Sequence, residues 1–265
     1  MMHPAAAIPL SANLGFLWTD RPLPDRIRAA ASAGFDAVEC HFPYDTHPDE
    51  VRAALQETGL PLLGLNTRPG DAAAGDFGLA ALPDRAEEAR AAIDQATDYA
   101  AAVGCGAIHV MAGRGGTDVA FADALAYALD RTQGSDRTIL IEPINTHDVP
   151  DYFLNTPTQA AEIIARIGHP RLRMMFDCYH VARQTGDILA QFTTHRAWVA
   201  HVQFAGVPDR AEPDTGQVDY PDLLRRIRDA GYAGPFGAEY RPRGATDDGL
   251  AWMEAYDVGS SRQDK

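Results

Sequence analysis

Leu172-Arg-Met-Met-Phe-Asp177 is a short, mainly apolar stretch that ends in a carboxylate, and three other stretches of the chain repeat this design. They are Thr138-Ile-Leu-Ile-Glu142-Pro143, Val199-Ala-His-Val-Gln203 and Pro235-Phe-Gly-Ala-Glu239-Tyr240. Each has the length of a β-strand and carries an oxygen-bearing side chain at its C-terminal end. A polar side chain at the end of a buried strand costs free energy unless it is paired or binds a cation. We therefore expect the four strands to meet at one shared site.

The rest of the chain alternates short apolar runs with longer segments that are rich in Ala, Arg and Glu and have helical periodicity. This alternation predicts β–α units and a parallel sheet, here a single (β/α)8 barrel, or TIM barrel, of the α/β class. The expected strands centre on Leu10–Phe16, Ala37–His41, Leu62–Asn66, Ala107–Met111, Ile139–Glu142, Arg173–Asp177, Val199–Gln203 and Phe236–Glu239. The expected helices lie at Pro22–Ala33, Pro48–Thr58, Asp84–Val103, Ala120–Arg131, Thr158–Ile167, Asp187–Thr193, Tyr220–Ala230 and Asp247–Ala255.

The length of the chain fits one domain. Its 265 residues are close to the roughly 250 of a typical barrel of this kind. We expect residues 1–256 to form a single barrel domain and residues 257–265 to be a disordered tail. The longest irregular insertion, Arg68–Leu82, is a candidate lid, because long loops in barrels often cover or bind the ligand.

Composition and charge argue against several classes of function. A formal net charge of −14 does not suit a protein that binds the phosphates of a nucleic acid. The only lysine is Lys265, so a Schiff-base mechanism, which needs a buried lysine, is not expected. Cys40, Cys105 and Cys178 are widely spaced, which favours neither disulfides nor structural zinc and indicates a reducing compartment. No secretion signal and no apolar run of about 20 residues is seen, so we expect a cytoplasmic protein without a membrane partner.

The four strand-end side chains form a hard-oxygen set. Glu142, Asp177 and Glu239 supply carboxylates and Gln203 supplies an amide, which are ligands suited to Mg²⁺ or Mn²⁺. Barrels of this kind hold their active sites at the C-terminal ends of the strands, where all four residues are expected. Three of them also have a structural interpretation: Glu142 as the partner of an arginine, Asp177 as a helix N-cap and Gln203 as a solvated strand residue. The regular placement of all four favours the metal site.

Histidines near the strand ends are candidates for binding the substrate. His180 lies just past Asp177 and is expected to reach the mouth of the barrel, as is His41. His109 and His201 are interpreted as hydrogen-bonded core residues. A site with several histidine ligands would instead indicate zinc.

Two arginines and one asparagine complete the candidate substrate-binding residues. Arg241 and Arg243 follow Glu239 in an Arg-Pro-Arg sequence, and a pair of guanidinium groups suits a carboxylate substrate. Solvated loop arginines explain the same sequence equally well. Asn66 stands at the C-terminal end of the third expected strand.

Several motifs together resemble the hydroxypyruvate isomerase family, within the xylose-isomerase-like TIM barrels. The matching segments are Ser11-Ala-Asn13-Leu, Gly34-Phe-Asp-Ala-Val-Glu39, His41-Phe-Pro-Tyr44, Gly78-Leu-Ala-Ala-Leu-Pro83, His109-Val-Met-Ala-Gly113, Ile141-Glu142-Pro-Ile-Asn145, Tyr152-Phe-Leu-Asn-Thr156, Phe176-Asp177-Cys-Tyr-His180, His201-Val-Gln203, Glu212-Pro-Asp-Thr-Gly216 and Glu239-Tyr-Arg-Pro-Arg-Gly244. They run from about residue 9 to residue 255. The departures are Cys178, Ala238 and the loop Asp71–Gly75, and only the loop is expected to affect how the substrate fits.

The resemblance implies a metal-dependent isomerase that interconverts hydroxypyruvate and tartronate semialdehyde (2-hydroxy-3-oxopropanoate) through an enediolate. It also implies that Glu142, Asp177, Gln203 and Glu239 bind a divalent cation, Mg²⁺ or Mn²⁺, and that Glu142 and Glu239 are the acid/base pair. The expected partner is a small hydroxy-oxo acid, and a homo-oligomer is compatible with the sequence.

Four alternatives stay open at this point. An isomerase of a related sugar acid, a 2-oxo-tetronate, and a ketose 3-epimerase would use the same metal and the same two carboxylates. An abasic-site endonuclease can share the barrel, but it would need histidine-rich zinc ligands and a basic face for DNA. A non-catalytic sugar-binding barrel would have little reason to place two carboxylates on a metal.

Overall fold

The computed structural model describes residues 7–256, so the expected tail at 257–265 lies outside the described residues. Eight parallel strands follow the order β2-β1-β8-β7-β6-β5-β4-β3. They are β1 Leu10–Asn13, β2 Ala37–Glu39, β3 Gly64–Asn66, β4 Ala107–His109, β5 Thr138–Ile141, β6 Leu172–Asp177, β7 Val199–Phe204 and β8 Phe236–Ala238. The two outer strands of this order meet through a bridge between Val38 and Leu62. The sheet is thereby a nearly closed barrel, which confirms the predicted fold.

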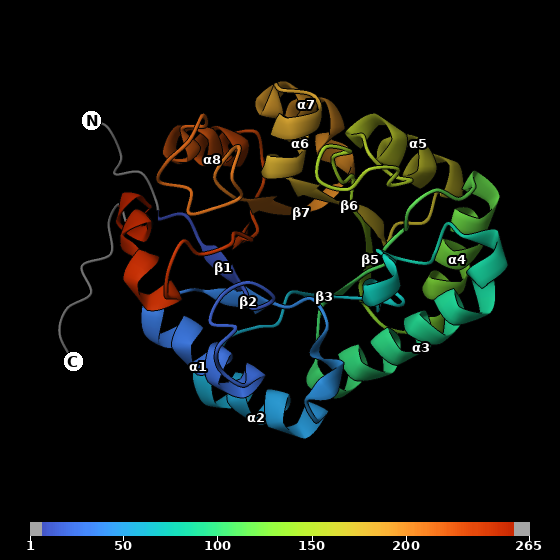
Figure 1. Cartoon of the computed structure of the whole chain (residues 1–265), viewed down its shortest axis with the longest axis horizontal. Helices are drawn as coiled ribbons and strands as arrows, with labels where there is room; N and C mark the ends of the chain where they lie inside the picture. Colours follow the sequence, from blue (N-terminus) through green and yellow to red (C-terminus); the bar gives the residue numbers. More distant parts are fainter. Residues whose placement is uncertain (1–6, 257–265) are drawn as a thin grey trace.

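Helices surround the strands in a ring (Figure 1). They are α1 Leu23–Ala33, α2 Pro48–Thr58, α3 Ala86–Val103, α4 Asp118–Arg131, α5 Pro157–Ile167, α6 Cys178–Gln184, α7 Ile188–His195 and α8 Tyr220–Asp229. Within residues 7–256, none of the helices is both long enough and apolar enough to cross a bilayer.

One helix was missed by the sequence analysis and one predicted helix was wrong. The short helix α6 was not predicted; it begins because the Oδ1 atom of Asp177 accepts a hydrogen bond from the backbone N–H of Tyr179, at 2.8 Å. The expected helix at Asp247–Ala255 is instead two 3₁₀ turns, Thr246–Gly249 and Ala251–Ala255. Gly249 ends the first of these turns and disfavours a continuous α-helix.

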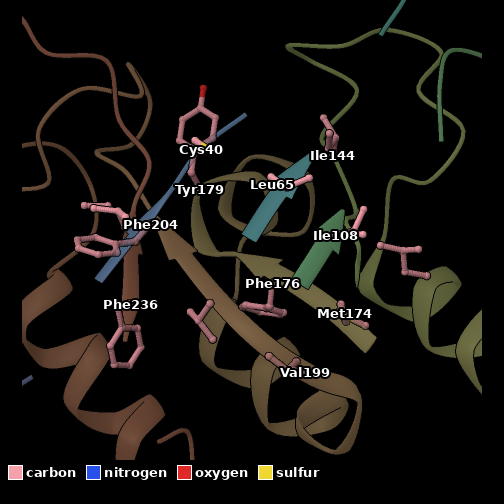
Figure 2. Close-up of a cluster of buried hydrophobic side chains, with 14 of the residues drawn as sticks. Cys40, Leu65, Ile108, Ile144, Met174, Phe176, Tyr179, Val199, Phe204 and Phe236 are labelled. Carbon is pink, nitrogen blue, oxygen red and sulfur yellow. The ribbon is translucent and has the colours of Figure 1, made fainter. Parts of the chain in front are cut away.

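The hydrophobic core lies mainly between the barrel and the helices. Figure 2 shows part of it, including Ile108, Met174 and Phe176, all of which are buried. The ring of Phe176 packs edge-on against Phe192 of α7, with the ring centroids 5.6 Å apart. Burial of side chains of this size contributes about 1.5–3 kcal/mol each, so this layer fixes the strands and the positions of their C-terminal ends.

The inside of the barrel is unusually polar. Asn13, Glu39, His109, His201 and Gln203 are all buried. Along a strand, side chains two residues apart lie on the same face, which places His201 and Gln203 together. The interior of a TIM barrel is normally filled by branched apolar residues. The polar interior therefore indicates a functional site rather than simple packing.

Candidate active site

A cavity of about 570 Å³ lies at the mouth of the barrel. Its lining includes six residues that the sequence predicted for the site: His41, Asn66, Glu142, His180, Glu239 and Arg241. Glu142 directly follows β5 and Glu239 directly follows β8. The loop of residues 68–82 contributes Phe77 to the same wall. The strand ends and the loops that follow them thus build one pocket.

A second cavity, of about 350 Å³, is lined by residues that precede β3, β4 and β8, such as Pro61, Gly104 and Pro235. It shares Asn66 and His109 with the first cavity. The carboxylates Glu142 and Glu239 line only the first, so that cavity is the candidate active site.

Two of the predicted cation ligands have a buried oxygen atom without a hydrogen-bond partner: Oε1 of Glu142, which lines the first cavity, and Oε1 of Gln203, which lines the second. The Nε2 atom of Gln203 donates to Oε1 of Glu39 at 3.0 Å, which leaves the amide oxygen without a partner. A buried acceptor in this state costs about 1–3 kcal/mol, a cost that a bound cation would remove. Carboxylate and amide oxygens are ligands that suit a hard divalent cation.

The three carboxyl groups differ in their pKa values. Burial, together with the charges of Glu239 and Asp177, raises the pKa of Glu142 well above its ordinary value. Burial also raises the pKa of Asp177, to about 7, against the opposing effect of Arg210. Burial acts in the same direction on Glu239, but Arg210 and a hydrogen bond from His41 outweigh it and lower its pKa to about 2. The site therefore holds both protonated and ionised carboxyl groups near neutral pH.

Arg210 is a site residue that the sequence analysis missed. Its Nη2 atom lies 2.8 Å from Oε2 of Glu239 and 3.5 Å from Oδ2 of Asp177. Its guanidinium carbon is 5.3 Å from the ring centre of Phe16 and 5.1 Å from that of Tyr179. Arg210 thus places positive charge between two proposed cation ligands. Its position in the loop after β7 was the only signal in the sequence that could have indicated this role.

The histidines around the site have different partners. Nε2 of His41 lies 2.6 Å from Oε1 of Glu239. Nε2 of His180 lies 3.7 Å from Oε1 of Glu142 and 3.6 Å from Oδ2 of Asp177. Burial, helped by the charge of Arg210, lowers the pKa of His180 well below its ordinary value. His180 is therefore a neutral imidazole at the centre of the site.

His201 and His109 have different environments, although both were interpreted as hydrogen-bonded core residues. His201 forms a very short contact with Glu39, whose charge raises the pKa of His201 against the effect of burial. The prediction is wrong for His109, which is buried with no hydrogen-bond partner for either ring nitrogen. Burial lowers its pKa to about 3. His109 lines the active-site cavity instead of being held in the core.

The two arginines of the Arg-Pro-Arg sequence separate. Arg241 lines the cavity, with its guanidinium carbon 5.3 Å from the ring centre of Phe16. Arg243 does not line it and instead pairs with Glu212 at 2.7 Å and with Asp214 at 2.8 Å. The expected contact between Arg243 and the substrate is therefore not supported, because Arg243 lies outside the lining of the cavity.

Gly237 provides the space that the inner network needs. It lies on β8 opposite Gln203 of β7. A Cβ atom at this position would come within 2.6 Å of Oε1 of Glu39 and 2.9 Å of Cγ of Gln203. Any side chain here would displace both residues and, with them, the proposed amide ligand.

Residues 27–256 match the family described as xylose isomerase-like TIM barrel, and the chain belongs to this family. It is 42% identical to the 2-oxo-tetronate isomerase of Cupriavidus necator, over 93% of this chain and 97% of that protein. It is 35% identical to the hydroxypyruvate isomerase of Escherichia coli, over 93% and 98%. A crystal structure from Brucella melitensis, described as an AP endonuclease of family 2, has a TM-score of 0.89 at 37% identity and covers 94% of this chain and 99% of that one.

Proposed function

We propose that the protein is a metal-dependent isomerase of small hydroxy-oxo acids, which interconverts hydroxypyruvate and 2-hydroxy-3-oxopropanoate. The observation that carries the proposal is that Glu142 and Glu239 are buried side chains that directly follow β5 and β8 and line one cavity. A carboxylate that faces a bound substrate can accept a proton from one carbon atom and return it to the adjacent one. The names of the relatives, which include 2-oxo-tetronate and hydroxypyruvate isomerases, support the same class of reaction.

The reaction moves one proton between adjacent carbon atoms. One of the two glutamates accepts a proton from C3 of hydroxypyruvate, and a proton returns to C2 from the pair. The proton of the C3 hydroxyl group passes to the oxygen on C2, so that the aldehyde forms at C3 and no atom is gained or lost. General acid–base catalysis of this kind contributes about 10²–10⁴-fold to the rate.

The proposed cation ligands are Glu142, Asp177, Gln203 and Glu239. The two unpartnered oxygens, on Glu142 and Gln203, support this set. When bound, Mg²⁺ or Mn²⁺ supplies positive charge close to the oxygens on which negative charge develops.

The substrate carboxylate is proposed to bind the arginines of the cavity. Arg210 and Arg241 both lie against Phe16, and Arg114 lines the same cavity. A planar guanidinium group can bind a carboxylate through two parallel hydrogen bonds. His41, His180 and Asn66 are proposed to orient the remaining oxygens of the substrate.

The proposal can be tested by ¹H NMR of the EDTA-treated protein with hydroxypyruvate in D₂O, before and after addition of Mg²⁺ or trace Mn²⁺. We expect 2-hydroxy-3-oxopropanoate to appear, with deuterium on carbon, only after the metal is added. Turnover that persists in the fully metal-free protein would contradict the proposed cation site.

A second candidate substrate is a four-carbon 2-oxo-tetronate. Two observations favour it: the 42% identity to the Cupriavidus necator enzyme and a cavity of about 570 Å³, which leaves room for a longer chain than three carbons. Measuring kcat/KM for both acids under the same conditions decides between them. DNA cleavage is not favoured, because the net charge of −14 repels a phosphate backbone.

A further inference from the structure

We propose that Asn145 is a positioning residue that fixes the tautomer of His180, so that His180 presents an N–H group to the carboxylates and cannot serve as a metal ligand. In this way Asn145 selects a cation that is bound by oxygen atoms over zinc. The inference deepens the proposed function and rests on its cation site.

The orientation of the Asn145 amide follows from two partners whose roles are fixed. The backbone N–H of Asp148 can only donate, and it donates to Oδ1 of Asn145 at 2.9 Å. The carboxylate of Asp148 accepts from Nδ2 of Asn145 at 3.1 Å. Both contacts require the same assignment of oxygen and nitrogen in the amide. Nδ2 is therefore the atom that faces His180.

This orientation determines which nitrogen of His180 carries the proton. Nδ2 of Asn145 lies 2.6 Å from Nδ1 of His180, and the backbone N–H of Asn145 points to the same nitrogen at 3.4 Å. Because both groups at Asn145 are donors, Nδ1 must be an acceptor. In a neutral imidazole the single proton then lies on Nε2.

The protonated nitrogen is the one that faces the metal site. Nε2 of His180 is 3.7 Å from Glu142 and 3.6 Å from Asp177. Glu142, Asp177 and His180 otherwise have the spacing of a metal-binding cluster, with ligand atoms within 4.8 Å of one another. Such a mixed set of imidazole and carboxylate ligands suits zinc. A nitrogen that carries a proton has no lone pair for a metal, so only the oxygen ligands are left.

Neighbouring residues fix the position of the Asn145 side chain. Asn145 is fully buried. Its partner Asp148 also accepts a hydrogen bond from the hydroxyl group of Tyr179 at 2.7 Å. Tyr179 and His180 are consecutive residues of α6. Hydrogen bonds thus connect the loop after β5 to the helix after β6, next to the ring of His180, whose tautomer Asn145 determines.

The first experiment needs neither metal nor turnover. In the metal-free protein labelled with ¹⁵N-histidine at pH 8, NMR is expected to show His180 as a neutral ring with its proton on Nε2. A proton on Nδ1, or an imidazolium ion, would overturn the proposal. Because this measurement is independent of activity, it also separates failure of the inference from failure of the proposed reaction.

The second experiment changes the donor at position 145 into an acceptor. In Asn145→Asp the carboxylate would accept a proton from Nδ1, since the side-chain contact is shorter than the backbone one, and Nε2 would become free for zinc. Outer-shell partners of this kind change metal affinity by about 10–100-fold, so we expect the affinity for Zn²⁺ relative to Mn²⁺ to rise at least about tenfold. The control is Asn155→Asp, in the same loop, where the side-chain amide of Asn155 donates to the carbonyl oxygen of Tyr152 and not to a histidine. An unchanged ratio in folded Asn145→Asp would overturn the proposal.

A third variant keeps the inference testable if Asn145→Asp does not fold. His180→Ala is expected to keep its affinity for Mn²⁺ within about threefold, whereas Asp177→Ala loses a ligand and about 10–100-fold or more in affinity. An equal loss in both variants would mean that His180 is a ligand.

Discussion

The guanidinium group of Arg210 lies 2.8 Å from the carboxylate of Glu239, and it also lies over the rings of Phe16 and Tyr179. Arg210 is therefore part of the electrostatics of the site and the main reason that the pKa of Glu239 is lowered against burial. The planar group stacks on aromatic faces in a way that an ammonium ion does not.

Replacement of Arg210 is expected to impair catalysis. Arg210→Met should lower kcat/KM by about 10²–10³-fold, because one preorganised cationic donor is lost from the site. Arg210→Lys should recover little of this loss, because lysine lacks the planar fork. Steady-state kinetics with hydroxypyruvate provide the measurement. The matched control is Arg243→Met, in which the arginine that pairs with Glu212 is removed, and this variant should keep near-normal KM.

The two glutamates of the acid/base pair are expected to be indispensable. Glu142→Gln and Glu239→Gln should each lower kcat by about 10²–10⁴-fold or more, since each removes a proton-transfer group. Circular dichroism should show the fold unchanged. Glu162→Gln, at an exposed position of α5, is the control. Retained turnover in either site variant would contradict the assignment.

Stability should depend on pH through Asp177. Its pKa is raised from 3.8 to about 7 in the folded protein, so between these pH values the folded state holds a proton that the unfolded chain has released. Raising the pH across this window therefore lowers the free energy of unfolding of the metal-free protein. Urea unfolding at pH 5, 6 and 7 should show the wild type losing stability relative to Asp177→Asn. A constant difference between the two proteins would refute the assigned pKa.

Metal binding should release a proton. Because Asp177 and Glu142 have raised pKa values, a divalent cation has to displace protons from them near and below pH 7. The affinity for Mn²⁺, measured by isothermal titration calorimetry, should increase from pH 6 to pH 8. Titrations in buffers of different ionisation enthalpy should report the released protons. An affinity independent of pH would exclude these carboxylates as ligands.

The contact between Glu39 and His201 in the barrel interior should contribute to the stability of the protein. Glu39 contacts His201, Gln203 and Asn13, so Glu39→Gln leaves the buried ring of His201 without its carboxylate partner. We expect a loss of about 1–3 kcal/mol in the free energy of unfolding, measured with urea. The double variant Glu39→Gln/His201→Gln should regain part of it, because the unpaired ring nitrogen is removed. No recovery would indicate that the loss arises from other contacts of Glu39.

The sequence predicted the barrel and much of the site because both follow from strand periodicity. A parallel strand that ends in a carboxylate places that group at the same edge as its neighbours, so Glu142 and Glu239 could be located from spacing alone. Asp177 is the N-cap of α6, as one interpretation predicted, while its role as a cation ligand stays a prediction. Its Oδ1 atom caps α6, while its Oδ2 atom lies toward His180 and Arg210.

Residues in loops could not be predicted in this way. Arg210 reaches the site through the path of the chain after β7, and no periodicity determines that path. Arg241 and Arg243 are two residues apart in the sequence, yet only Arg241 lines the cavity. The difference depends on Glu212, which lies 31 positions from Arg243 in the sequence, and such a distant partner leaves no local signal.

The crowding around Gly237 has a consequence for attempts to change the substrate of this protein. A side chain at position 237 would move Glu39 and Gln203. A substitution on this strand would therefore disturb the proposed amide ligand. The walls contributed by Phe77 and Arg241 come from loops and carry no such restriction. Exchange of whole loops with a relative is therefore the route by which this barrel would acquire a new specificity, with its inner layer left as it is.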